Sequence, residues 1–196
     1  SQVRYLGHLV SADGIYPLNE NIQKVLKYPV PQDLKQLRSF VGLAAYYRKF
    51  VKNFAQIAKP LTEMTKKGKI WTWGATEQKA FNQLKENLVR PPILCYPRYD
   101  ALFILQTDAS DRTIGAVLGQ KQEGLERVVA YGSRSPTPAE QNYSTIEKEA
   151  LSIVNFVGEY RHYLLGRKFI IETYHNPLSF LNKQSEPKGR LGRWAI

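Results

Sequence analysis

FILQTDAS, residues Phe103–Ser110, is the stretch that decides the fold, because it predicts an apolar β-strand that ends in one acidic side chain, Asp108. Two further β-rich runs follow it, and turn-forming residues such as Asp111 and Gly124 separate the three. Short β-rich runs divided by turn formers are typical of hairpins. The sequence therefore predicts an antiparallel three-stranded meander over Leu102–Thr107, Thr113–Gly119 and Val128–Ser133.

A helix is predicted after the meander. Ser144 and Glu147 have the S-x-x-E spacing of a capping box, in which each side chain binds the backbone N–H of the other residue. The apolar residues at helical spacing predict a buried stripe of Ile146, Ala150, Ile153, Val154 and Val157. A fourth strand over Lys168–Thr173, a helix start at Pro177–Leu181 and the opening of another helix at Arg190–Ile196 follow. This order predicts an α/β (α+β) domain with a mixed sheet, incomplete at its C-terminus.

The first half of the chain has a different pattern. A short hairpin is predicted over residues 1–18, with an apolar-rich run at Val3–Val10 and a turn at residues 12–14. Three small helices are predicted next, with an N-cap at Asp33 and spans over Ile57–Thr65 and about Thr76–Leu88. Two adjacent prolines, Pro91 and Pro92, end the third helix and begin an extended linker. We therefore expect a hairpin at 1–18, a basic helical module at 19–92 and a further domain at 93–196.

The net charge of +11 is unevenly distributed. Residues 1–92 hold 15 Lys and Arg against 6 Asp and Glu, a net charge of +9, whereas residues 93–196 hold 13 against 11, a net charge of +2. Lysines and arginines that replace condensed counterions drive nucleic-acid binding. On charge alone, a polyanionic partner and a solvated surface that keeps the protein soluble are about equally favoured.

The helix capped at Asp33 is predicted to continue through Tyr46, Tyr47, Arg48 and Lys49, where aromatic residues are interleaved with cations. Aromatic side chains can stack on bases, but an aromatic stripe on a helix more often belongs to the core. We assign the core to Phe40, Leu43 and Phe50. The residues that we expect to contact phosphate in this half are Arg48, Lys49, Lys52, Lys66 and Lys67.

Several protein classes are disfavoured. No window approaches the 18 or so consecutive apolar residues that a membrane span needs, and the N-terminus has neither a hydrophobic leader nor a small-residue cleavage site. The sequence thus predicts no membrane partner and an intracellular protein. The single cysteine, Cys95, lies in a proline-rich apolar segment and is expected to be a buried structural thiol.

Seven motifs in one order resemble the Pol polyprotein of long-terminal-repeat retrotransposons of the Ty3/gypsy type. They are YLGH (5–8), LRSFVGLAAYYRKFVKNFA (37–55), KPLTEMTKK (59–67), TDAS (107–110), YSTIEKEAL (143–151), YLLGRKF (163–169) and GRW (192–194). The resemblance covers nearly the whole chain and corresponds to the end of reverse transcriptase followed by RNase H. It implies that residues 1–18 are the last hairpin of the polymerase palm and that residues 19–92 are a connection or thumb-like module. It also implies an RNA/DNA template-primer as partner, with the rest of the Pol polyprotein upstream and downstream.

The resemblance further implies a metal site. RNase H enzymes use two Mg²⁺ ions, roughly 4 Å apart, that need several carboxylate oxygens from different elements. Of the four acids expected in the family, Asp108 would be the first and Glu149 the second, with Mg²⁺ or Mn²⁺ as the cofactor. The helical wheel alone does not choose between Glu147 and Glu149, because both lie beside apolar positions. The family motif chooses Glu149 and leaves Glu147 as the cap.

Tyr174 contradicts this metal site. The third acid should precede the histidine of a Thr-Asp-His triplet, but this chain has Thr173, Tyr174 and His175. A neutral phenol provides neither the charge nor the paired oxygens that Mg²⁺ requires. The fourth acid would follow Trp194, near the end of the chain. We therefore expect binding of RNA/DNA hybrid without cleavage, with His175 in a structural or phosphate-contacting role.

Two other functions remain open from the sequence. The chain could be an active RNase H that tolerates Tyr174, using Mn²⁺ and an acid supplied from elsewhere, or a captured protein-interaction domain that no longer binds nucleic acid. The charge of the first half argues against the second of these. A non-catalytic role has a precedent in the connection subdomain of retroviral polymerases, which resembles RNase H and lacks its acids.

Overall fold

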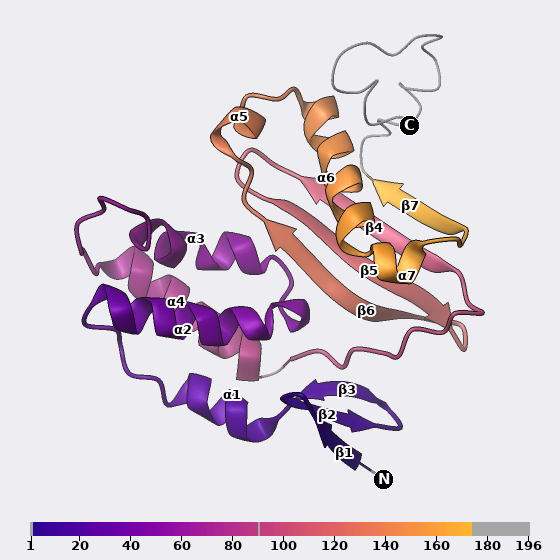
Figure 1. Ribbon diagram of the computed structural model, residues 1–196, viewed down its shortest axis with the longest axis horizontal. Coiled ribbons are helices and arrows are strands. Elements are labelled where there is room, and N and C mark those ends of the chain that lie inside the picture. Colours follow the sequence, from indigo (N-terminus) through magenta and orange to yellow (C-terminus); the bar gives the residue numbers. More distant parts are fainter. Residues whose placement is uncertain (1, 90, 174–196) are drawn as a thin grey trace. The chain divides into compact units, whose positions relative to one another are not determined.

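The computed structural model describes residues 2–89 and 91–173, and the chain divides between Tyr96 and Pro97 into two compact units. The hairpin expected at 1–18 and the helices expected at 19–92 lie in the same unit (Figure 1). Among the described residues, no helix is long and apolar enough to cross a membrane. The helix starts expected at 177–181 and 190–196 lie outside the described residues.

The first unit begins with a small antiparallel sheet. Its strands are β1 (Gln2–Tyr5), β2 (His8–Ser11) and β3 (Gly14–Pro17), in the order β1-β2-β3. The predicted turn at residues 12–14 joins β2 to β3, and Leu6 and Gly7, which both have positive φ, form a further tight turn inside the apolar-rich run Val3–Val10. Tyrosines from a helix hold this turn: the Tyr46 hydroxyl donates to the Leu6 carbonyl at 2.5 Å and the Tyr47 hydroxyl to the Gly7 carbonyl at 2.9 Å.

Helices make up the rest of the first unit. The helix predicted after Asp33 is confirmed, since the carboxylate of Asp33 accepts from the Gln36 N–H at 2.7 Å. This helix ends at Tyr46 and does not continue through Lys49 as predicted, because a separate 3-10 turn follows. The helices are α1 (Asn19–Leu26), α2 (Leu34–Tyr46), the 3-10 helix η1 (Arg48–Phe50), α3 (Phe54–Met64) and α4 (Ala75–Val89).

The core of the first unit is aromatic. Phe40 of α2 and Phe81 of α4 lie 4.4 Å apart between ring centroids, a close contact for two aromatic rings. The predicted core positions Phe40 and Phe50 are confirmed as fully buried, whereas Leu43 is only half-buried. Tyr47 is also buried, so the aromatic residues near the end of α2 divide between the core and the turn that they hold.

The second unit is a mixed sheet with helices on one face. The predicted meander is confirmed as β4 (Phe103–Ala109), β5 (Ile114–Gln122) and β6 (Leu125–Arg134), and the predicted fourth strand as β7 (Phe169–Thr173). The sheet order is β6-β5-β4-β7, with β7 parallel to β4 and the other pairs antiparallel. Between β6 and β7 the chain forms α5 (Pro138–Gln141), α6 (Thr145–Glu159) and α7 (Arg161–Leu164) (Figure 1).

Helix α6 packs on β4 and β5, and its buried side differs in part from the predicted stripe. Ala150 and Ile153 are buried as predicted, but Ile146 and Val154 are 38% and 39% exposed. The buried side instead includes Glu149 and Phe156. Close packing also depends on Gly132 of β6, where a Cβ atom would lie 2.6 Å from the Phe156 ring. Any larger residue at position 132 would push the helix from the sheet.

Candidate functional site

Glu149 is the buried carboxylate of the second unit. It lies in the second turn of α6, one helical turn before Ile153, and it is 2% exposed. Its Oε2 accepts a hydrogen bond of 2.8 Å from the hydroxyl of Thr173, the last described residue of β7. An acidic side chain is rarely this buried unless polar groups surround it, so its position indicates a built polar site rather than a solvated helix surface.

The structure separates the roles of Glu149 and Glu147, which the helical wheel left open. The Oε2 of Glu147 accepts from the backbone N–H of Ser144 at 2.9 Å and from its hydroxyl at 3.0 Å. The Ser144 hydroxyl in turn accepts from the Glu147 N–H at 3.3 Å, which completes the predicted capping box. Glu147 therefore holds the start of the helix, whereas Glu149 extends to the end of β7.

Asp108 lies at the same end of the sheet, on a different element. It is an exposed residue near the end of β4, where it pairs with Gly115 of β5. The preceding residue, Thr107, pairs with Thr173 across the parallel β4 and β7 strands. Asp108 thus lies one residue beyond the level at which Glu149 meets β7. The carboxyl ends of two parallel strands and the first half of α6 bring two carboxylates to one end of the sheet.

These groups fit a divalent metal only in part. Both carboxylates are hard oxygen ligands of the type that Mg²⁺ prefers, and the Thr107 hydroxyl on the adjacent strand position is buried without a hydrogen-bond partner among the described residues. Over residues 2–89 and 91–173, however, no group of three or more His, Cys, Asp or Glu side chains is arranged to hold a metal ion. Tyr174 and His175 lie outside the described residues, as does the segment after Trp194.

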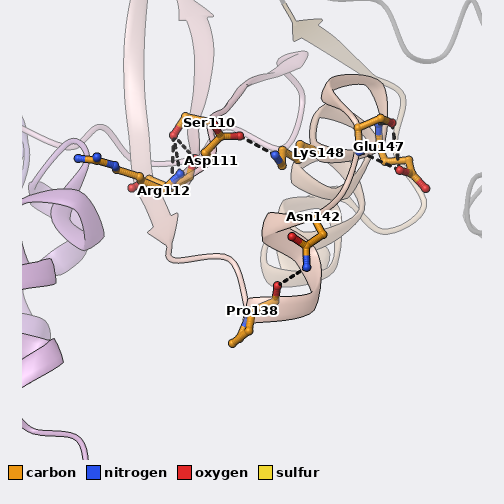
Figure 2. A network of polar contacts seen from close by, with 9 residues as sticks. Ser110, Asp111, Arg112, Pro138, Asn142, Glu147 and Lys148 are labelled. Carbon is orange, nitrogen blue, oxygen red and sulfur yellow. Dashed lines mark hydrogen bonds and ion pairs between the residues drawn. The ribbon is translucent and has the colours of Figure 1, made fainter. Parts of the chain in front are cut away.

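A second polar contact lies near this end of the sheet, and the sequence analysis did not predict it. Figure 2 shows Lys148 of α6 extending to Asp111 in the turn between β4 and β5, with Nζ and Oδ1 2.5 Å apart. The Lys148 side chain is 11% exposed and Asp111 is 84% exposed, and the hydrogen bond from Lys148 lowers the pKa of the Asp111 carboxyl. The Ser110 hydroxyl accepts from the N–H groups of Arg112 and Thr113, and these hydrogen bonds stabilise the turn after Asp108. A lysine one residue before a buried glutamate gives no sequence signal that it will bind a turn 37 residues away.

The candidate phosphate-binding residues of the first unit differ in their surroundings. Arg48 and Lys52 are exposed, whereas Lys49 is half-buried with its Nζ 5.3 Å from the centroid of the Phe50 ring. Burial lowers the pKa of the Lys49 ammonium. Lys66 and Lys67 are exposed just after the end of α3, and Lys66 forms an ion pair of 2.7 Å with Glu63 in the last turn of that helix.

Comparisons with known proteins match this arrangement. The model of the RNase H-like domain found in reverse transcriptase matches residues 73–171, half of the chain. The retrovirus-related Pol polyprotein from transposon 297 of Drosophila melanogaster is 43% identical over 196 residues, and the transposon Tf2-3 polyprotein of Schizosaccharomyces pombe is 38% identical over 201 residues. Each alignment covers the whole chain, but the chain spans only 18% and 15% of those polyproteins.

Solved structures of a viral reverse transcriptase share the fold. The foamy viral protease-reverse transcriptase in complex with double-stranded DNA matches 99% of this chain and 35% of its own, with a TM-score of 0.84 and 24% identity. The same protein in complex with an RNA/DNA hybrid matches 98% of this chain and 27% of its own, with a TM-score of 0.80 and 22% identity. The family model and the polyprotein matches show that the chain belongs to the RNase H-like domains found in reverse transcriptase, in the Ty3/gypsy-type Pol polyproteins of retrotransposons.

Proposed function

We propose that this chain is the part of a retrotransposon Pol polyprotein that holds the RNA/DNA template-primer and does not itself cut the RNA strand. Residues 1–18 end the polymerase palm, residues 19–92 are the basic connection module, and residues 93–196 are the RNase H-like domain. One observation carries the proposal. The residue after Thr173, whose hydroxyl binds the buried Glu149, is a tyrosine where the family pattern has a metal-binding aspartate.

Binding is supported by the distribution of charge. The net charge of +9 over residues 1–92 includes exposed cations at Arg48, Lys52 and Lys67. A surface of this kind neutralises phosphates and releases counterions, so the affinity falls steeply as salt rises. The hybrid is recognised through its backbone and its minor-groove shape rather than by base sequence. His175 adds a phosphate contact beside Tyr174.

The absence of cleavage follows from the ligand set. In RNase H chemistry, two bound Mg²⁺ ions supply an activated water and stabilise the departing oxygen. Asp108 and Glu149 provide two of the acids in the family pattern, but position 174 has a tyrosine, and a phenol gives neither the charge nor the paired oxygens that a Mg²⁺ site requires. The residues of this chain therefore orient and hold a hybrid, and we derive no cleavage step from them.

A cleavage assay tests this proposal. A labelled RNA/DNA hybrid is incubated in Mg²⁺ and in Mn²⁺ with the chain, with Tyr174→Asp and with Tyr174→Phe as the matched control. Each protein is also prepared fused to the segment that follows the matched region in a related Pol polyprotein. We expect cutting only by the extended Tyr174→Asp form, because it alone combines a carboxylate at position 174 with the segment that carries the fourth acid in the family pattern. Cutting by the unchanged chain would overturn the proposal.

That last outcome would establish the second candidate, an active RNase H that tolerates Tyr174. The observation in its favour is that Asp108 and Glu149 come from separate elements to one end of the sheet. A binding titration of the same hybrid at several salt concentrations provides the other arm. If the hybrid showed no salt-dependent affinity at all, the chain would be a captured protein-interaction domain instead.

A further inference from the structure

The loop between α3 and α4 (Figure 1), residues 65–74, contains three lysines. Lys66, Lys67 and Lys69 are all exposed. Gly68 between them has a φ of 80°, a conformation that favours glycine, and the Lys69 N–H donates to the Lys66 carbonyl at 3.3 Å. The turn therefore gathers the three ammonium groups over a short length of chain.

Two tryptophans follow the lysines and stack on each other. The ring centroids of Trp71 and Trp73 are 5.9 Å apart with planes only 20° from parallel. Trp73 is the anchored member of the pair, because its ring meets the Phe81 ring edge-on at 5.8 Å and its Nε1 donates to the Gln78 side chain at 2.9 Å. Trp71 is consequently held flat on a fixed base while it remains half-exposed.

The segment that carries this stack is positively charged. From Lys66 to Trp73 the sequence contains no Asp or Glu. Among the described residues, Lys66 pairs with Glu63, whereas no ion pair involves Lys67 or Lys69. Ile70, beside Trp71, is 86% exposed. A large apolar side chain and a flat indole thus lie next to two lysines that form no ion pair among the described residues.

We propose that residues 66–73, which we name the lysine–tryptophan loop, bind an unpaired stretch of nucleic acid next to the duplex. This inference rests on the proposed binding function and adds a separate contact to it. Trp71 stacks on an unpaired base, which any base permits because every base has a π-face, and Lys67 and Lys69 contact the phosphates on either side. A duplex offers no free base face along its length, so the loop acts on template overhangs.

The test compares two hybrids with the same duplex, one blunt and one with a six-nucleotide single-stranded overhang. Affinities are measured by fluorescence anisotropy at low salt for the unchanged chain, Trp71→Leu and Trp71→Phe. Leucine keeps an apolar side chain beside Trp73 but removes the π-face, whereas phenylalanine keeps both an apolar side chain and a π-face. We expect Trp71→Leu to weaken binding of the overhang hybrid about fivefold or more and to change the affinity for the blunt hybrid less than about twofold. Trp71→Phe should keep nearly the full affinity for the overhang hybrid.

The lysines provide an independent readout. Lys67→Ala and Lys69→Ala should each lower the salt dependence of overhang binding by about 0.7 in the logarithmic slope, the value for one phosphate on a single strand, and leave the blunt slope unchanged. Equal overhang affinity for Trp71→Leu and the unchanged chain, with blunt hybrid still bound, would refute the loop's role and leave the proposed function intact. If neither hybrid bound at low salt, both proposals would fail together.

Discussion

Glu140 contributes to how the stability of the second unit responds to acid. Its carboxylate accepts from both terminal nitrogens of Arg134, at 2.7 and 2.9 Å, and from the Thr137 N–H at 2.7 Å. Arg134 also donates to Asn155 of α6 at 2.6 Å, so the group ties β6, α5 and α6 together. The hydrogen bonds from Arg134 are the main cause that lowers the pKa of Glu140 from 4.5 to about 2.

The size of the effect follows from that pKa. A fall from 4.5 to about 2 corresponds to roughly 3.4 kcal/mol at 1.36 kcal/mol per pKa unit. The Arg134 side chain is 30% exposed, so water screens the pair and we expect about 1–2 kcal/mol of stability at neutral pH. Because the pKa is lower in the folded state, this contribution is complete above pH 4.5 and is lost as the pH falls towards 2.

Glu140→Gln tests this reasoning by urea denaturation followed by circular dichroism at pH 7 and pH 3. We expect the variant to be less stable by about 1–2 kcal/mol at pH 7, and the difference to shrink by more than half at pH 3. Glu126→Gln, which changes an exposed glutamate on the same strand β6, is the matched control and should stay within about 0.5 kcal/mol at both pH values. A loss for Glu140→Gln of equal size at both pH values would refute the argument.

Three further changes test the site, the packing and the binding surface. Thr173→Val removes the hydroxyl that donates to Glu149 and should destabilise the second unit by about 1–3 kcal/mol in urea denaturation; unchanged stability would contradict the role of that bond. Gly132→Val should lower the melting temperature at a cost of about 1–3 kcal/mol, whereas Gly158→Ala, with no atom near its added Cβ, should raise it. Lys52→Ala should reduce the salt slope of hybrid binding by about one, measured by anisotropy, and an unchanged slope would remove it from the phosphate-binding set.

Local patterns in the sequence were sufficient for most of the second unit. Each strand of the meander is bounded by turn formers such as Asp111 and Gly124, and the capping box of Ser144 and Glu147 is a contact within one helical turn. These features depend on residues close in sequence, so a pattern of a few residues is enough to predict them. The helical wheel placed Glu147 and Glu149 alike beside apolar positions, and the structure buries Glu149, which shares a helical face with Phe156.

Features that depend on distant residues were missed. Helix α1 has no capping side chain at Leu18, and only Ile22 and Val25 are buried, against α2 and α4, so its stability comes from tertiary packing. The turn at Leu6 and Gly7 depends on the hydroxyls of Tyr46 and Tyr47, 40 residues away at the end of α2. The same limit applies to the site, because neither the Thr173 bond to Glu149 nor the Lys148 pair with Asp111 is implied by sequence spacing.

The parallel pairing of β7 with β4 has a consequence for how the polypeptide acquires its structure during synthesis. The three meander strands pair with their neighbours as soon as they emerge, but β4 must wait for α5, α6 and α7 before β7 can join it. Until then β4 is an open edge that can pair with another chain. In a long polyprotein this interval is a point of vulnerability to misassembly, and ribosome pausing between residues 134 and 169 would extend it.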